Sequence, residues 1–371
     1  MKHTPRSHRV AVNILLAVSA TLLFSCQGRA EIEGPEDFLV MAYYAGNEMA
    51  IDRYEVSGLT HIIFSFSRLE GNRMVIPDRR VETLRRLVSL KDDHPSLRVI
   101  IALGGWGGCE TCSEVFSSPE GRSEFSFSVR EVLEVYGADG IDLDWEYPAI
   151  SGYPGHPYMA ADKQNFTLLV EKLRDVLGEE FEIGFAAGGF KRFFDESVEW
   201  DKVMPVVDYV NIMTYDLVSG GSPVTGHHTP LYSTPMQSRS VDFAVNYLDS
   251  IGVDPAKLVI GAAFYGRAWE NVPDENMGLY QPATFKTAIT YRELYDWIEE
   301  NSMTEFWDEI AHAPYAFSAE TGLFATYDNP RSVRLKTRYA IENGLGGIMF
   351  WQLAGDRHDD GLLHAIYREL E

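Results

Sequence analysis

Eight apolar runs of strand length recur along the chain, and they constrain its fold more than any other feature. Segments with apolar residues at helical spacing separate them, which predicts repeated βα units and a parallel sheet. Eight strands close such a sheet into a (β/α)8 TIM barrel, and the 371 residues suit one domain of this type. The strand-like runs are 38–44, 60–67, 98–104, 140–146, 182–187, 209–215, 258–265 and 347–353. The helix-like segments include 81–90, 123–136, 163–177, 240–251 and 330–343.

Three acids alternate with apolar residues in the fourth run. Alternate side chains of a strand point to opposite faces, so Asp142, Asp144 and Glu146 share one face. At a spacing of about 7 Å, two such charges repel by about 2 kcal/mol. We therefore expect a coupled row in which at least one carboxyl keeps its proton towards neutral pH, as general acid catalysis requires. A solvated acidic strand is the plainer alternative, but acids are depleted from strands.

The spacing of these acids resembles the active-site signature of glycoside hydrolase family 18, the chitinases and their relatives. Its pattern is Asp-x-x-Asp-x-Asp-x-Glu, and the chain matches it with Asp139, Asp142, Asp144 and Glu146. The resemblance extends over nearly all of residues 38–356. It includes the family's Met-x-Tyr-Asp motif and its seventh and eighth strands, at 213–216, 259–267 and 346–351. The resemblance implies an active site at the carboxyl ends of the barrel strands.

The resemblance also accounts for a long gap between the seventh and eighth runs, where a βα connection normally needs far fewer residues. Residues 270–325 contain short aromatic-rich pieces that resemble the small α+β insertion of chitinases with deep clefts. A long decorated loop is the alternative. The expected domain organisation is therefore a catalytic barrel over 38–371 with an insertion at 270–325.

The resemblance implies roles for four residues. Glu146 would protonate the glycosidic oxygen and later activate water. No second carboxylate is offered as a nucleophile, and the family belongs to the substrate-assisted exceptions among glycosidases. The sugar's 2-acetamido oxygen would therefore attack the anomeric carbon. Asp144 would hold the acetamide N–H, Tyr215 would orient its carbonyl, and Asp142 would exchange a proton with Asp144.

Further residues at the predicted strand ends are candidates for sugar binding. Trp351 would form the floor of the pocket, since a tryptophan at a barrel mouth suits sugar stacking. Tyr43, Phe66 and Met213 would line the pocket, although large inward side chains also fill barrel cores. Candidates for sugar hydroxyls and acetyl groups are Asp216, Tyr265 and Arg267.

One position departs from the family pattern. Where the family usually has Ser-x-Gly-Gly on the third strand, this chain has Ala102-Leu103-Gly104-Gly105. The serine hydroxyl normally supports the buried first acid of the row. We therefore expect the loss of this hydroxyl to disturb the pKa values of Asp139 and Asp142. Asp139 is expected to have a supporting, structural role. This is compatible with reduced activity and does not require loss of activity.

The glycine-rich segment after the third strand carries two further candidates. Gly105 and Trp106 are expected to border the substrate, although Trp106 suits a packed loop equally well. Cys109 and Cys112 lack the second pair that zinc would need, so a short-loop disulfide is expected in an exported protein, with inert thiols as the alternative. The His227–His228 pair also lacks a carboxylate at ligand spacing, which favours a loop contact over metal. No cofactor is expected.

The first 25 residues resemble a signal peptide, with three basic residues before an apolar run at 10–24. Leu-Phe-Ser-Cys at 23–26 resembles a bacterial lipoprotein box, which implies a lipidated Cys26 and a tether at 26–37. Plain secretion is the alternative. The net charge of −23 argues against nucleic acid and anionic membranes as partners and is compatible with a neutral polysaccharide. Membrane attachment is expected only through the lipid, and the protein is expected to be a monomer.

The leading hypothesis is an enzyme, a chitinase that hydrolyses β-1,4-linked N-acetylglucosamine polymers with retention of configuration. An endo-β-N-acetylglucosaminidase acting on N-glycans is the enzymatic alternative, and the insertion favours chitinase because it would raise one wall of a cleft. A catalytically silent carbohydrate-binding protein on the same fold is a third hypothesis. The presence of the catalytic acid Glu146 argues against this third hypothesis, and Ala102 is the only residue that supports it.

Overall fold

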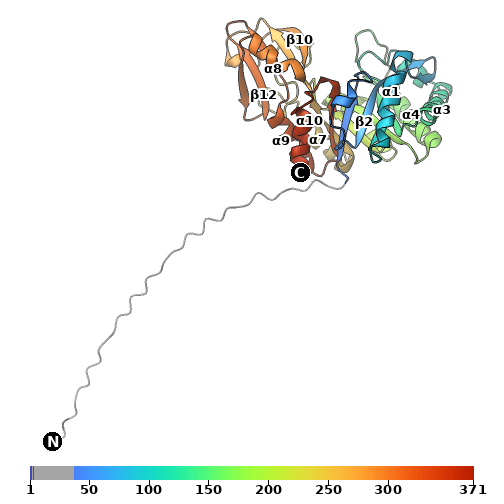
Figure 1. Cartoon of the computed structure of the whole chain (residues 1–371), viewed down its shortest axis with the longest axis horizontal. Helices are drawn as coiled ribbons and strands as arrows, with labels where there is room; N and C mark the ends of the chain where they lie inside the picture. Colours follow the sequence, from blue (N-terminus) through green and yellow to red (C-terminus); the bar gives the residue numbers. More distant parts are fainter. Residues whose placement is uncertain (2, 4–36) are drawn as a thin grey trace. The chain divides into compact units, whose positions relative to one another are not determined.

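The computed structural model describes residues 1, 3 and 37–371. The predicted signal peptide, Cys26 and nearly all of the predicted tether lie outside the described residues. None of the helices in the described part of the chain has the length and apolar composition needed to cross a bilayer. Figure 1 shows the folded body with its helices and strands labelled.

Eight parallel strands form a closed barrel, as the sequence predicts. They pair in the order β1-β14-β8-β7-β6-β5-β4-β2, and the pairing of β1 with β2 closes the ring. A short hairpin strand, β3 (Arg73–Val75), extends β2 outside the ring. The barrel strands are β1 (Leu39–Tyr44), β2 (His61–Glu70), β4 (Arg98–Gly104), β5 (Gly140–Asp144), β6 (Glu182–Gly188), β7 (Tyr209–Met213), β8 (Leu258–Ala263) and β14 (Gly347–Trp351).

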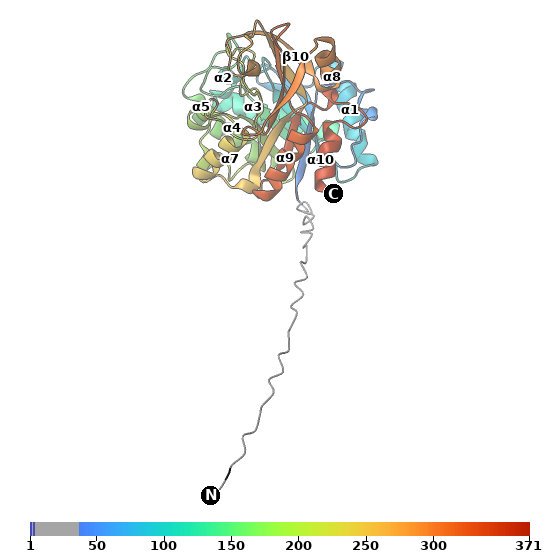
Figure 2. The same ribbon diagram turned by 90° about the vertical axis from the view of Figure 1, so that its left-hand side faces the viewer.

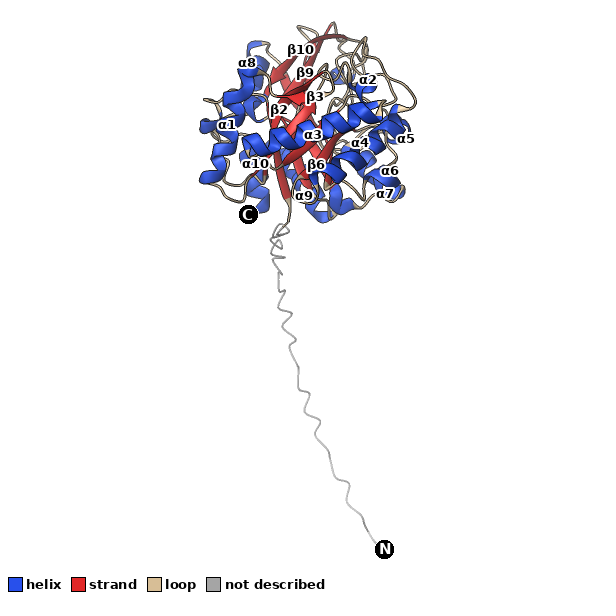
Figure 3. Cartoon of the chain, turned by 90° about the vertical axis from the view of Figure 1, so that its right-hand side faces the viewer, coloured by secondary structure: helices blue, strands red, loops and turns tan. Residues whose placement is uncertain are grey.

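Helices surround the barrel on its outer side (Figure 3). They are α1 (Val81–Ser89), α2 (Cys112–Phe116), α3 (Pro119–Tyr136), α4 (Asp162–Leu177), α5 (Lys191–Glu196), α6 (Trp200–Val203), α7 (Val241–Ser250), α9 (Pro330–Glu342) and α10 (Leu362–Leu370). The third of these begins four residues before the predicted start at 123. Ser118 accepts a hydrogen bond from the backbone N–H of Gly121, and Pro119 occupies the first helical position, so this cap fixes the earlier start.

Two apolar clusters lie on the two sides of the barrel wall. The inner cluster fills the barrel with side chains such as Met41, Tyr43 and Met349. The outer cluster packs alternate residues, such as Val40 and Ala42, among the helices. The strand period of two thus divides each strand between the barrel interior and the helical layer.

A second sheet of five antiparallel strands lies between β8 and β14, in the order β10-β9-β13-β12-β11. It consists of β9 (Tyr265–Glu270), β10 (Thr284–Thr290), β11 (Thr304–Asp308), β12 (Ala313–Ser318) and β13 (Leu323–Thr326), with helix α8 (Tyr291–Glu300). Its own core contains Trp269, Tyr315 and Phe324. Figure 2 shows β10 and α8 at the end of the barrel opposite to the C-terminus. The insertion starts at Tyr265, five residues earlier than expected, because the predicted run 258–265 ends as a barrel strand at Ala263.

A fully buried ion pair links helix α9 to strand β8 and to the loop that contains Thr229. Lys336 Nζ on α9 lies 2.6 Å from Asp328 Oδ2, and both side chains have no exposed surface. Asp328 Oδ2 also accepts the backbone N–H of Ala263, and Lys336 donates to the Thr229 hydroxyl. Burial lowers the pKa of Lys336, whereas the carboxylate beside it favours the charged form.

We expect Lys336→Met to lower the free energy of unfolding by about 3–5 kcal/mol, because it leaves the Asp328 charge buried without its partner. Urea titration monitored by circular dichroism measures the loss. Lys172→Met on α4 is the matched control, since Lys172 pairs with a 70% exposed Asp175. Its expected loss is below about 1 kcal/mol. Equal losses in the two variants would contradict the assignment of a buried, tightly held pair.

Candidate active site

The three acids of the fourth strand lie at the mouth of the barrel. Asp142 and Asp144 point into the barrel from β5 and are 0% and 5% exposed, while Glu146 follows the strand and is half-buried. The alternate residue Trp145 points outward, where its ring lies 5.6 Å from that of Phe116 and 6.4 Å from that of Phe166. The alternation thus continues two residues past the last residue of the strand, and the outer core anchors it.

Asp142, the deepest acid, receives hydrogen bonds on both oxygens. The Tyr43 hydroxyl donates to Oδ2 at 2.8 Å, and the Asn211 amide donates to Oδ1 at 3.1 Å. Tyr43 is 1% exposed and belongs to the inner cluster, so it combines the two roles that the sequence left open. Asp142 is therefore held in place by groups from β1 and β7.

Burial raises the pKa values of all three acids. The pKa of Asp142 rises to about 6 because of burial, against the opposing effect of its hydrogen bonds from Tyr43 and Asn211. The pKa of Asp144 lies well above its usual range because burial, Glu146 and Asp142 all raise it. Burial raises the pKa of Glu146 to about 7. Near neutral pH the row therefore holds at least one proton, with a carboxylic acid at its open end.

Two polar groups beside the row have few partners in the protein. The Oδ1 atom of Asp144 is buried and accepts no hydrogen bond. The Tyr215 hydroxyl lies at the mouth and contacts the Sδ atom of Met349 at 3.9 Å, and burial holds its pKa well above the usual range. A buried polar group without a partner is costly, so both atoms suit hydrogen bonds with a bound molecule.

Asp216 is the centre of a second cluster of polar side chains at the mouth. Unlike the row of acids, this cluster contains a cationic side chain, Arg267. Tyr265 donates to its carboxylate at 2.7 Å, Arg267 pairs with both of its oxygens, and His228 Nδ1 lies 3.6 Å away. Burial opposes ionisation, but the neighbouring His228 ring and the hydrogen bonds from Arg267 hold the pKa of Asp216 below its usual range. Asp216 is therefore an ionised carboxylate, fixed in place between the barrel and β9.

The aromatic candidates gather at the same mouth. The Trp351 ring, at the end of β14, stacks on Phe66 with centroids 5.6 Å apart and lies 5.9 Å from the Tyr43 ring. Phe66 and Trp351 are half-buried, and Met213 is 9% exposed. These side chains form an apolar surface beside the carboxyl row, of the kind on which a sugar ring stacks.

Trp106 lies on a loop after β4 and is 59% exposed, so it is not a packed loop residue. Its ring meets the Tyr153 ring edge to face, with centroids 5.6 Å apart. Gly105 has a φ of 77°, and a Cβ atom there would come within 2.5 Å of the Phe66 ring, so only glycine fits. A disulfide joins Cys109 to Cys112 in the same loop.

Asp139 lies away from the row, before the first residue of β5. It accepts hydrogen bonds from Lys91 at 2.8 Å and from the backbone N–H of Val99 at 2.8 Å. Ala102 is instead the register partner of Asp142, on the neighbouring strand. Of the two acids, it is therefore Asp142, and not Asp139, that lies beside Ala102.

The two histidines lie in buried loop positions. His227 Nε2 contacts Asp308 of the insertion at 3.0 Å, and His228 lies beside Asp216. Within residues 37–371, no cluster of three His, Cys, Asp or Glu side chains could hold a metal ion. The sequence reasoning missed Asn211 as a site residue, although it shares a strand face with Met213 and Tyr215.

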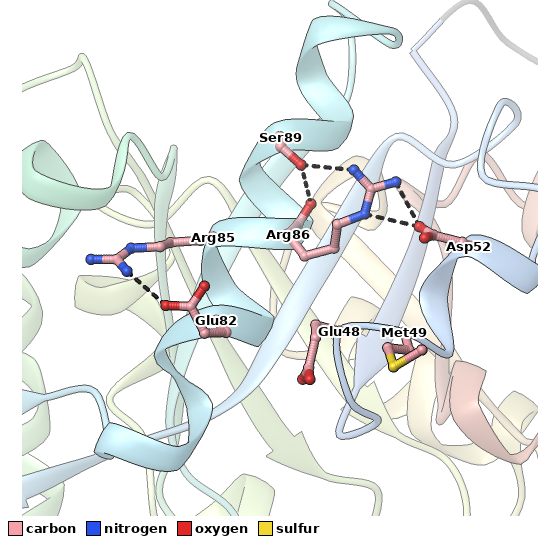
Figure 4. Close-up of a pocket in the computed structure, with 7 residues that line it drawn as sticks. All are labelled: Glu48, Met49, Asp52, Glu82, Arg85, Arg86 and Ser89. Atoms are coloured by element: carbon pink, nitrogen blue, oxygen red, sulfur yellow. Dashed lines mark hydrogen bonds and ion pairs between the residues drawn. The ribbon is translucent and has the colours of Figure 1, made fainter.

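A separate hollow of about 440 Å³ lies on the outer wall, between the 3-10 helix η1 (Ile51–Arg53) and α1 (Figure 4). Four of its charged residues form two ion pairs, Arg86 with Asp52 and Arg85 with Glu82. None of the carboxyls of the row lines it, so this hollow is separate from the barrel mouth.

Sequence comparison agrees with this arrangement. The profile of the family described as Glycosyl hydrolases family 18 matches residues 39–356. Chitinase A1 of Niallia circulans is 35% identical over 74% of this chain, and chitinase B of Serratia marcescens is 29% identical over 84% of it. This chain spans 43% of the length of the first relative and 76% of the second.

Solved structures give the same result. A glycoside hydrolase family 18 N-acetylglucosaminidase from Paenibacillus barengoltzii is 34% identical, with a TM-score of 0.82 over 90% of this chain and 100% of that chain. An Ostrinia furnacalis Group IV chitinase in complex with allosamidin is 26% identical, with a TM-score of 0.82 over 90% of this chain and 98% of that chain.

The raised pKa of Asp142 predicts a pH-dependent stability. Its folded pKa of about 6 exceeds the unfolded value near 4, so its contribution to stability is fully present below about pH 4 and is lost as the pH rises through 6. In Asp142→Asn the substituted amide does not titrate. Between pH 4 and pH 7 the wild type should therefore lose about 2–3 kcal/mol more of its free energy of unfolding than the variant does. Urea titrations at both pH values measure this, and parallel pH curves would contradict it.

Proposed function

Because this chain belongs to family 18 of the glycosyl hydrolases, we propose that it is a chitinase that cleaves β-1,4-linked N-acetylglucosamine polymers. The observation that carries the proposal is the desolvated carboxyl row with Glu146 at its open end. A carboxylic acid with a pKa of about 7 suits protonation of a glycosidic oxygen near neutral pH. The relatives named as chitinases support chitin as the substrate.

The mechanism that we propose is retaining and substrate-assisted. A protein nucleophile would have to be an ionised carboxylate facing the row, and Asp216 is the ionised carboxylate described at this mouth. Its two oxygens are occupied by Arg267 and Tyr265, so it is poorly suited to attack a sugar. The substrate's own 2-acetamido oxygen would form the bond to the anomeric carbon as Glu146 protonates the leaving oxygen. Glu146 would then take a proton from the water that opens the cyclic intermediate.

The unsatisfied polar atoms beside the row suit this chemistry. The free Oδ1 of Asp144 would accept the acetamide N–H, and the Tyr215 hydroxyl would donate to the acetamide carbonyl. Both contacts hold the acetamide for attack, and the one from its N–H to Asp144 strengthens as positive charge develops on the acetamide. Asp142 would exchange a proton with Asp144 as this charge changes.

The surrounding residues would bind the sugar chain. Trp351 would form the floor beneath the reacting sugar, and the exposed Trp106 ring would offer a second stacking platform. Arg267, on the wall that the insertion raises, and Asp216, which follows β7, would contact hydroxyl or acetyl groups. Phe66 and Met213 would complete the pocket, which binds chitin oligosaccharides without a cofactor.

One relative favours a second candidate function. The Paenibacillus structure, described as an N-acetylglucosaminidase, is similar to this chain over its whole length. Release of single N-acetylglucosamine units is therefore the alternative to release of longer chitin oligomers. A product profile from chitin hexamers separates the two, and an N-glycan in the same assay tests the endo-β-N-acetylglucosaminidase alternative. Export with a lipidated Cys26 and a monomeric state stay predictions.

We expect Glu146→Gln to fold normally, to bind chitin oligomers and to lose at least about a hundredfold in kcat, because the amide cannot donate the proton. Turnover of a chromogenic chitobioside and calorimetric binding of a chitin tetramer measure the two effects. Glu82→Gln on the outer wall, where Glu82 pairs with Arg85, is the matched control and should keep wild-type turnover. Wild-type turnover in Glu146→Gln would rule out this residue as the acid.

The substrate-assisted mechanism ties hydrolysis to the acetamido group. Cellulose oligomers lack this group, so they supply no nucleophile and leave Asp144 and Tyr215 without partners. We expect no detectable cleavage of cellulose oligomers in a sensitive chromatographic assay. We also expect competitive inhibition by a thiazoline that mimics the cyclised intermediate and binds more tightly than substrate.

Two results would overturn this mechanism. One is cleavage of fully deacetylated chitin oligomers at the rate of acetylated ones. The other is a sugar covalently trapped on a protein carboxylate, detected by mass spectrometry of the quenched enzyme.

A further inference from the structure

The Asn211 amide donates a hydrogen bond to Asp142, the deepest acid of the row, across an intervening strand. It lies on β7, and Asp142 lies two strands away on β5, yet its Nδ2 atom is 3.1 Å from Asp142 Oδ1. The same nitrogen is 3.2 Å from the Tyr43 hydroxyl, which itself donates to the other oxygen of Asp142. Three fully buried side chains from three strands therefore form one closed hydrogen-bonded group.

Small residues on the intervening strand make this contact possible. On β6, Gly184 is the register partner of Asp142, and Ala186 is the register partner of Asn211. A Cβ atom at Gly184 would come within 2.2 Å of the Tyr209 ring, so this position excludes any larger side chain. The Tyr209 ring thus covers Gly184, and the amide reaches across β6 beside the small side chain of Ala186.

The third strand supplies no polar group to Asp142. Ala102 is its register partner there, and its methyl group belongs to the apolar inner cluster. Where the family usually has a serine, this chain has no hydroxyl, so the donors recorded for Asp142 are Tyr43 and Asn211. Hydrogen bonds to a buried charged group contribute more than those to a neutral one.

We propose that Asn211 is a positioning residue for the proposed reaction: with no hydroxyl at Ala102, its amide acts with the Tyr43 hydroxyl to hold Asp142 in its ionised form. An ionised Asp142 repels charge on Asp144 and keeps the shared proton there. The Asn211 carbonyl oxygen has no partner, so a rotated amide can also accept a hydrogen bond from the O–H of a neutral Asp142. Asn211 thus serves both states of the proton exchange between the two acids.

The test removes the amide and keeps its volume, with Asn211→Leu. Aspartate labelled with 13C at its carboxyl carbon reports the titration of Asp142 by NMR, with its signal assigned by its loss in Asp142→Asn. We expect the pKa of Asp142 to rise by about one to two units. The acidic limb of the kcat/KM profile should shift upward by the same amount, since Asp142 must be able to accept a proton.

Ala102→Ser in the Asn211→Leu background is the rescue. The new hydroxyl lies beside Asp142 on the neighbouring strand and should return both the titration and the acidic limb part of the way. Ser197→Ala is the matched control, because this hydroxyl is also fully buried and unpartnered but lies after α5, outside the group. It should leave both readouts unchanged.

Unchanged titration and pH profile in Asn211→Leu would overturn the proposal, as would a shift of equal size in Ser197→Ala. If Asn211→Leu does not fold, Ala102→Ser alone decides, since a third donor should lower the pKa of Asp142 and an unchanged value would count against the inference. The titration needs no substrate. Failure to cleave chitin would therefore contradict the proposed function and leave this test intact.

Discussion

The removal of three carboxyl groups from water is the constraint on which the rest of the site depends. Acids alternate with apolar residues along β5 and just beyond it. Trp145 therefore packs in the outer core, while Asp142 and Asp144 face the barrel interior. Desolvation then raises each pKa, and proximity makes the three acids titrate together. The proton available at Glu146 is thus a consequence of packing as much as of residue identity.

Asp216 lies at the same mouth, but its pKa is lowered where those of the row are raised. Asp216 is ionised because Arg267, on β9, the first strand of the insertion, pairs with both of its oxygens, and His228 lies beside it. The insertion therefore does more than raise a wall, since it determines which carboxylate at the mouth is charged. Two environments a few residues from the ends of β5 and β7 separate a proton donor from a fixed anion, which assigns different roles to similar side chains.

The sequence predicted the barrel, the limits of most of its strands and the residues of the acid row, because these depend on local periodicity and spacing. It did not predict the partners of the acids. Asn211 reaches Asp142 across β6, beside the small side chain of Ala186, and this proximity is a property of the closed barrel. Likewise, Asp139 fits the motif in sequence, but the strand places it at the other end, beside Lys91.

A buried hydrogen-bonded chain links the site to the ion pair behind it. Lys336 and Asp328 hold the Thr229 hydroxyl, which donates to the backbone carbonyl of Thr214, next to Tyr215. Thr214 in turn exchanges two hydrogen bonds with the backbone of Gly261 on β8. Buried ion pairs contribute little net stability compared with apolar packing, but one that loses a partner is strongly destabilising. Because the chain of hydrogen bonds ends at Thr214, the pair fixes the backbone next to Tyr215, whose hydroxyl lies at the mouth.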